Sequence, residues 1–150
     1  MDYTSALHTL GVFASGIFAG GALSTSVVQH PSLSETLKSD HEFLAHFQSF
    51  FPRAAKLQGS LALLSSFSLL ASYYLDATRD WKKLAAGLLM GSIFPFTMGF
   101  MMPVNNQFTK ALTGSTPTQP YTALFSTWGK LHWVRTIASI VAFGISVWKQ

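Results

Sequence analysis

The chain has 150 residues, enough for one domain, and only 11% of them are charged, whereas about a quarter is usual in soluble domains. Ten basic and six acidic residues give a formal net charge of +4. No stripe of Lys and Arg marks a nucleic-acid-binding face, so no nucleic-acid partner is expected. The absence of cysteine excludes disulfides, cysteine-based zinc sites and thiol catalysis.

The few charges are excluded from long stretches of the chain. Residues 10–28, 57–75 and 84–102 contain none, and 131–148 contains only His132 and Arg135 as ionisable groups. Each stretch is close to the ~20 residues that cross a hydrocarbon core of ~30 Å. The tryptophans lie at the ends of these stretches, as interfacial anchors do. The sequence therefore predicts an all-α integral membrane four-helix bundle, a single domain of residues 1–150 with spans at about 8–28, 55–76, 83–103 and 131–148.

The spans carry features that are typical of membrane helices. Asp2, with no Lys or Arg in residues 1–9, favours a retained first span over a cleaved signal peptide. Pro95 predicts a kink near residues 94–96. Two pairs with Gly-x-x-x-Gly spacing, in spans one and three, predict close helix approach: Gly16 with Gly20, and Gly87 with Gly91.

The connections differ in length and character. Residues 76–83 form a short, charged connection and predict an antiparallel hairpin. The basic residues of this short connection slightly favour a cytoplasmic N-terminus, because positive charges near span ends usually stay in the cytoplasm. Residues 105–130 contain glycine and prolines and predict a loop. Residues 29–56 predict an amphipathic helix between spans one and two, with Ser34 as its N-cap, that lies on the membrane surface or caps the bundle. Its apolar positions recur at helical spacing: Leu33, Leu37, Leu44, Phe47 and Phe51.

One end of the bundle collects the chemically capable side chains. In an up-down bundle the ends of spans one and three lie beside the starts of spans two and four. Trp128, His132 and Arg135 are spaced i, i+4, i+7 and share one helical face. A charge one turn inside the membrane usually faces the bundle interior, and a neutral histidine beside it can act as a base. Alternatively, Arg135 snorkels to lipid phosphates and His132 binds a loop carbonyl.

The remaining polar candidates allow two readings each. Asn105 and Asn106 can cap the third helix or donate hydrogen bonds to an oxyanion. His41 and His46, with His30 and His132, could bind a metal, but the spacing matches no metal motif and none is expected. His8 is expected to be solvated.

Two segments resemble the anthrone oxygenase family. One is Pro95-Phe96-Thr97 followed by Met102-Pro103-Val104-Asn105-Asn106-Gln107-Phe108, and the other is Trp128-Gly129-Lys130-Leu131-His132-Trp133-Val134-Arg135. The first-span glycines, the proline just past that span and the four-span layout are also similar. The resemblance covers essentially the whole chain, and its most specific parts are Pro-x-Asn and Trp-x3-His-x2-Arg.

This resemblance implies a membrane-bound monooxygenase of aromatic polyketide biosynthesis. It would oxidise an anthrone to an anthraquinone with molecular oxygen as co-substrate and without a cofactor. The expected partners are a hydrophobic polycyclic aromatic molecule and the lipid bilayer of an intracellular membrane such as the endoplasmic reticulum, and a homo-oligomer could form through a glycine face. The residues expected to act are His132 as base, Arg135, Asn105 and Asn106 on the oxyanion, and Trp128, His30, Pro103 and Met102 around the substrate.

Two other function classes fit the same composition. A non-catalytic membrane scaffold could bind pathway enzymes, and a small transporter could use four spans. The chain has neither an internal repeat nor an acidic relay, which makes the transporter the weaker alternative.

Overall fold

The computed structural model describes residues 2–36 and 39–148, which form helices and short connections without a strand. The helices form four long rods. Two of these rods contain a π-helical turn, which joins one α-helix to the next without a break. The elements are α1 (Tyr3–Ser24), the first π-helical turn (Thr25–Gln29), α2 (His30–Thr36), α3 (Asp40–Leu75), α4 (Trp81–Phe96), the second π-helical turn (Thr97–Met101), α5 (Met102–Leu112) and α6 (Tyr121–Val147).

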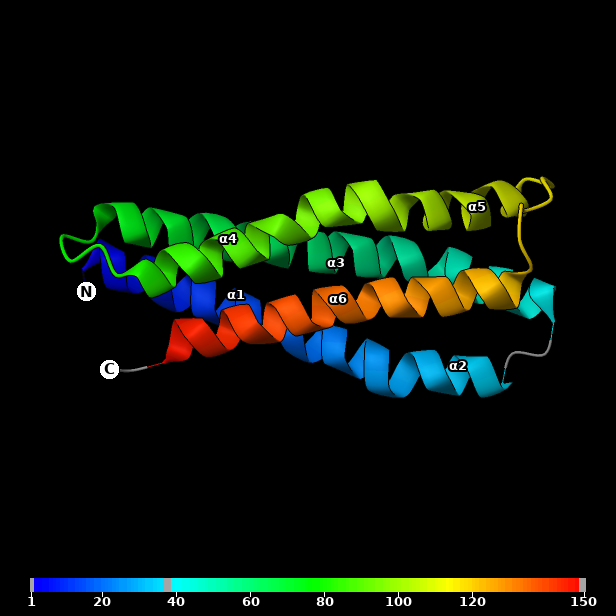
Figure 1. The fold of residues 1–150 in the computed structure, drawn as a ribbon, viewed down its shortest axis with the longest axis horizontal. Helices are drawn as coiled ribbons and strands as arrows, with labels where there is room; N and C mark the ends of the chain where they lie inside the picture. The colour runs from blue at the N-terminus through cyan, green and yellow to red at the C-terminus, as the bar shows by residue number, and fades with distance from the viewer. Residues whose placement is uncertain (1, 37–38, 149–150) are drawn as a thin grey trace.

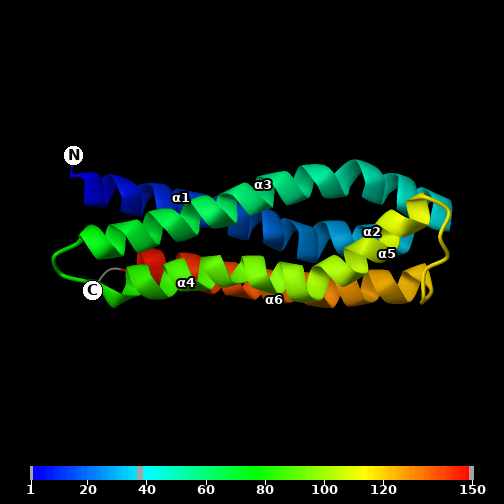
Figure 2. The same ribbon diagram turned by 90° about the horizontal axis from the view of Figure 1, so that it is seen from above.

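The rods form an antiparallel bundle (Figure 1). α3 packs between α1 and α4, and α6 packs against the same two helices from the other side. Figure 2 shows the same bundle from above, with α1 beginning and α6 ending at the end that holds the α3–α4 connection. The opposite end contains α2, α5 and the start of α6.

The outer surface of the bundle is apolar, as a bilayer requires. Phe13 and Phe67 are each more than half exposed, as are many aliphatic side chains. Three rods are long and apolar enough to cross a membrane: Tyr3–Thr36, Asp40–Leu75 and Trp81–Leu112. α6 is not among them, because its last 18 residues include Lys130, His132 and Arg135. The prediction of an all-α integral membrane bundle is confirmed, with three helices that are long and apolar enough to span a membrane.

Small residues bring the rods close together. The hydroxyls of Ser65 and Ser66 on α3 donate to the carbonyls of Gly11 and Gly87, each over 2.9 Å. A Cβ at Gly87 would lie 2.9 Å from the Leu70 side chain, so this glycine permits the approach of α4 to α3. In the first span, a Cβ at Gly16 would lie 3.0 Å from the Phe143 ring of α6, whereas Gly20 faces open space, so only one glycine of that pair lies at a close contact within this chain.

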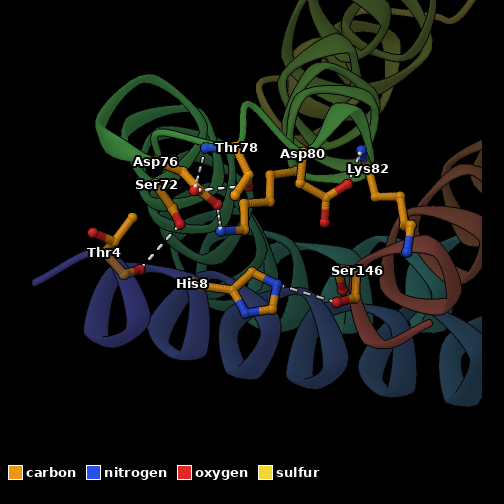
Figure 3. Close-up of polar contacts among 9 residues, drawn as sticks. Thr4, His8, Ser72, Asp76, Thr78, Asp80, Lys82 and Ser146 are labelled. Carbon is orange, nitrogen blue, oxygen red and sulfur yellow. Dashed lines mark hydrogen bonds and ion pairs between the residues drawn. The ribbon is translucent and has the colours of Figure 1, made fainter. Parts of the chain in front are cut away.

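Polar contacts close the end of the bundle that holds the hairpin (Figure 3). The connection between α3 and α4 spans residues 76–80, which confirms the predicted hairpin. Asp76 accepts hydrogen bonds from Lys83 and Thr78, and these bonds lower the pKa of its carboxyl from 3.8 to about 2. His8 is not solvated as predicted, because it is half-buried and its Nε2 lies 3.2 Å from the Ser146 carbonyl oxygen.

The predicted amphipathic helix is the first part of α3, continuous with the second span. Phe43 and Phe47 on it are buried against α5 and α6, so this segment caps the bundle. Its N-cap is Ser39, which forms a capping box with Glu42, and not Ser34, which lies inside α2. The sequence Ser-x-x-Glu is the local signal for that start. Leu37 lies outside the described residues.

Each π-helical turn leads into a proline. Pro31 and Pro103 have no N–H to donate to the carbonyl four residues earlier. The preceding residues, His30 and Met102, donate to the carbonyls of Thr25 and Thr97, five residues earlier. The helix continues through the proline as a result, and its axis changes direction between α4 and α5 (Figures 1 and 2).

This local geometry corrects two predictions. The irregular turn lies after Pro95, at Thr97–Met101, while α4 remains helical through Phe96. The predicted loop at 105–130 is confined to residues 113–120, because α5 runs to Leu112 and α6 begins at Tyr121. Asn105 and Asn106 therefore lie inside a helix and cap nothing.

Candidate functional site

A cavity of about 160 Å³ lies between α3, the second π-helical turn and α6. Ala62 and Ile93 on its wall belong to the core near the hairpin end, and Met101 and Trp128 belong to the aromatic core at the other end. The cavity therefore occupies the junction between two packed clusters. The polar residues that line it include Gln58, Asn105, Trp128, His132 and Arg135.

His132 is held from both sides on this wall. It is 2% exposed, and its ring stacks on Trp128 with centroids 4.9 Å apart. Its Nδ1 lies 3.0 Å from the Ser26 hydroxyl, which comes from the first π-helical turn. The imidazole is thus fixed in orientation at the edge of the cavity.

Arg135 places a guanidinium in the same cavity. Nη2 donates to the Gln58 side-chain oxygen over 2.8 Å, and Nη1 contacts the Met101 sulfur at 3.5 Å. The Phe18 ring lies 5.5 Å from the guanidinium carbon, at cation–π distance. These partners are an amide, a thioether and an aromatic face, which leave the positive charge available to an anionic ligand.

Trp128 is part of an aromatic cluster beside the cavity. Its ring centroid lies 6.1 Å from those of both His30 and Phe125, and His30 stacks on Phe125 at 4.3 Å. Nε2 of His30 lies 3.0 Å from the Phe125 carbonyl oxygen. A Cβ at residue 129 would overlap the His30 ring, so Gly129 provides the space in which this cluster forms. The cluster restrains the Trp128 ring.

Several polar atoms at the cavity lack a partner. Within the described chain, four buried side-chain nitrogen or oxygen atoms make no hydrogen bond. Three of them belong to residues of this one wall: Asn105 Oδ1, Trp128 Nε1 and Arg135 Nε. Buried polar groups are normally paired, and an unpaired one costs about 1–3 kcal/mol. Two unpaired donors and an acceptor thus belong to residues that line one cavity, where a polar aromatic ligand could pair with them after small side-chain shifts.

Comparison with known proteins adds an independent finding. The sequence profile described as anthrone oxygenase matches residues 47–145, about two thirds of the chain. The chain belongs to the anthrone oxygenase family. A protein named anthrone oxygenase from Claviceps purpurea (strain 20.1) is 27% identical over 135 residues, covering 83% of this chain and 77% of its own length. No solved structure matches the chain.

The segment shared with the anthrone oxygenase family contains every residue on the cavity wall, from Phe50 to Arg135. Of the eight predicted site residues, five line this cavity: Met102, Asn105, Trp128, His132 and Arg135. Asn106 and Pro103 are exposed on other faces of α5, because neighbouring residues on a helix point in different directions. His30 does not line this cavity and packs beside Trp128.

Sequence reasoning missed three of the polar residues around this site. Gln58 is the one amide side chain within the predicted second span, and that unusual placement was its signal. Ser26 and Thr136 resemble the many other hydroxyl residues of the spans, and nothing in the sequence distinguishes them.

The remaining histidines lie apart from one another. His41 is exposed, and His46 stacks on Phe50 with its Nε2 unpaired. Within residues 2–36 and 39–148, no three side chains of His, Asp or Glu come together as a metal site would need.

Proposed function

We propose that this member of the anthrone oxygenase family oxidises an anthrone-type aromatic polyketide to an anthraquinone with molecular oxygen and without a bound cofactor. The observation that carries the proposal is that three residues with an unpaired buried polar atom line the same cavity as His132. An apolar cavity of comparable size, about 150 Å³, holds one aromatic ring, so in this proposal one ring of the substrate occupies the cavity and the rest lies toward its open side.

The chemistry needs one base and a place for negative charge. Loss of a proton from the methylene carbon of an anthrone leaves an anion whose charge is spread onto the carbonyl oxygen. The anion gives one electron to dioxygen, and the two radicals combine to form a carbon–oxygen bond. The peroxide takes up a proton and then loses water as the remaining C–H proton leaves. Anthrone and dioxygen thereby give anthraquinone and water.

The cavity residues match these needs. His132 is the base, because its ring is fixed at the wall and its Nε2 makes no hydrogen bond within the described residues. Arg135 Nε and Trp128 Nε1 are unpaired donors for the developing oxyanion. Asn105 Oδ1 is an unpaired acceptor for a hydroxyl on the substrate, and the Trp128 ring is a stacking surface.

The substrate enters from the bilayer in this proposal. Phe94 and Met98 line the cavity and are about half exposed, at 50% and 47%, on the outer face of the bundle. A hydrophobic tricycle dissolved in lipid meets this face directly. We further propose that α6 is a fourth span, since Trp133, Val134 and Ile137 give it an apolar outer face, and that the membrane is an intracellular one such as the endoplasmic reticulum.

Oxygen consumption by the purified protein tests the proposal. The protein in lipid nanodiscs is given emodin anthrone without added flavin or metal, and the spontaneous rate in empty nanodiscs is subtracted. We expect one dioxygen consumed and one quinone formed per anthrone, in a sample whose metal content is far below one ion per chain. Binding of the anthrone without oxygen consumption would instead support a scaffold.

A further inference from the structure

The hydroxyls of Ser26 and Thr136 and the imidazole of His132 form a buried chain of hydrogen bonds. Ser26 Oγ lies 3.0 Å from His132 Nδ1 and 2.8 Å from Thr136 Oγ1. Thr136 Oγ1 lies 3.2 Å from the Ala22 carbonyl oxygen and 3.1 Å from the His132 carbonyl oxygen. Ser26, Thr136 and His132 are all less than 5% exposed, so water does not compete for these bonds.

The direction of the hydrogen bonds follows from the two carbonyls, which can only accept. A hydroxyl has one proton, and Thr136 uses it on a carbonyl oxygen. Thr136 Oγ1 then accepts from Ser26, and Ser26 Oγ, its own proton spent, accepts from His132 Nδ1. All three donors are satisfied in this direction. In the reverse direction, Thr136 and Ser26 donate toward Nδ1, the carbonyls receive no side-chain proton, and an N–H at Nε2 faces the cavity without a partner.

We infer that Ser26 and Thr136 are positioning residues that hold neutral His132 as the tautomer protonated at Nδ1. The lone pair of Nε2 then faces the cavity, which is the form a base needs. When Nε2 takes up a proton, Nδ1 still donates to Ser26, so the chain needs no rearrangement during the reaction. The catalytic consequence rests on the proposed function, whereas the tautomer can be measured without any turnover.

Nitrogen NMR of the protein labelled with ¹⁵N-histidine measures the tautomer. The His132 signals are assigned by their loss in His132→Gln, and protonated and unprotonated ring nitrogens are distinguished by chemical shift. We expect Nδ1 to carry the proton in the wild type and a mixture of tautomers in Ser26→Ala. Ser15→Ala removes a buried serine of α1 whose hydroxyl donates to the Val12 carbonyl, and should leave the signals unchanged. A wild-type His132 protonated at Nε2 would overturn the inference.

Kinetics of the same variants test the catalytic consequence. Loss of one neutral hydrogen bond to the base should lower kcat of Ser26→Ala about tenfold while the anthrone KM stays within about twofold. Ser26→Thr keeps the hydroxyl and should recover most of the rate, and Ser15→Ala should match the wild type. An unchanged kcat in Ser26→Ala would overturn this role. A wild type that consumes no oxygen would contradict the proposed function and leave the NMR result standing.

Discussion

At the level of single residues, Arg135 is the charged group that most strongly indicates what kind of ligand the cavity binds. An ionised group inside a membrane bundle is costly and is usually paired. Here its hydrogen bonds go to the Gln58 amide and the Met101 sulfur, and Nε remains unpaired. An oxyanion formed in the cavity, as the proposed reaction requires, would place a negative charge beside this guanidinium.

Gln58 should be needed for this placement. Gln58→Leu leaves Arg135 Nη2 without its acceptor, and we expect a loss of about 1–3 kcal/mol in the free energy of unfolding. Oxygen uptake should fall about tenfold because the guanidinium turns away from the substrate. Thermal unfolding in detergent and an oxygen electrode measure the two effects. Gln48→Leu, an exposed position on the same helix, is the control, and equal rates in the two variants would contradict the role.

The sequence predicts one wall of the site better than the others. Trp128, His132 and Arg135 lie on a single helix, where their spacing alone places them on one face. Gln58 and Ser26 come from other rods, and their approach to α6 depends on helix packing and on a π-helical turn that no local pattern announces. Asn105 lines the cavity, whereas Asn106 is exposed on another face of α5, because consecutive residues inside a helix point in different directions.

At the level of the elements, the contact between α3 and α4 depends on Gly87. A Cβ there would lie 2.9 Å from Leu70 Cγ and 3.3 Å from the Leu70 backbone nitrogen. Gly87→Ala should therefore lower the free energy of unfolding by about 1–3 kcal/mol. Gly20→Ala meets open space in a helix and should be neutral or stabilising by up to about 1 kcal/mol. Thermal unfolding of both variants in one detergent checks this, and the reverse order would contradict the packing.

The hairpin at Asp76 should respond to pH only in acid. Its carboxyl pKa is lowered to about 2 in the folded chain, so its contribution to stability is complete above the ordinary value of 3.8. That contribution is lost as the pH falls from there toward 2. The difference in Tm between wild type and Asp76→Asn should stay constant from about pH 8 to about pH 5 and shrink below about pH 4. A difference that changes near neutral pH would point to another group.

The long apolar stretches and the hairpin could be predicted because hydropathy and charge are read directly from the chain. The joining of residues 40–56 to the second span could not be predicted, because the charged and polar residues of that segment favoured a separate amphipathic helix, whereas α3 is continuous and includes Pro52. The continuation of the third rod to Leu112 could not be predicted either, because the glycine and prolines at 113–120 favoured a loop over the whole of 105–130, whereas the π-helical turn lets the helix continue past Pro103.

At the scale of the whole molecule, the proposed fourth span predicts that the start of α1 and the end of α6 lie on one side of the membrane. The chain has no cysteine, so single cysteines report sidedness without background. Ser5→Cys, Ala77→Cys and Trp148→Cys should react with an impermeant maleimide from one side of sealed vesicles, and Ser115→Cys from the other. Labelling of Trp148→Cys on the same side as Ser115→Cys would contradict a fourth span while leaving the other three in place.

The most direct measurement of the central claim is oxygen uptake by His132→Gln beside the wild type, with emodin anthrone in nanodiscs. Glutamine keeps the size of the side chain but cannot take the proton, and general base catalysis typically contributes 10²–10⁴-fold. We expect the catalysed rate to fall at least about a hundredfold. His41→Gln, at an exposed histidine outside the cavity, should retain the wild-type rate. Wild-type turnover by a folded His132→Gln protein would contradict the assignment of this cavity as the site of oxidation.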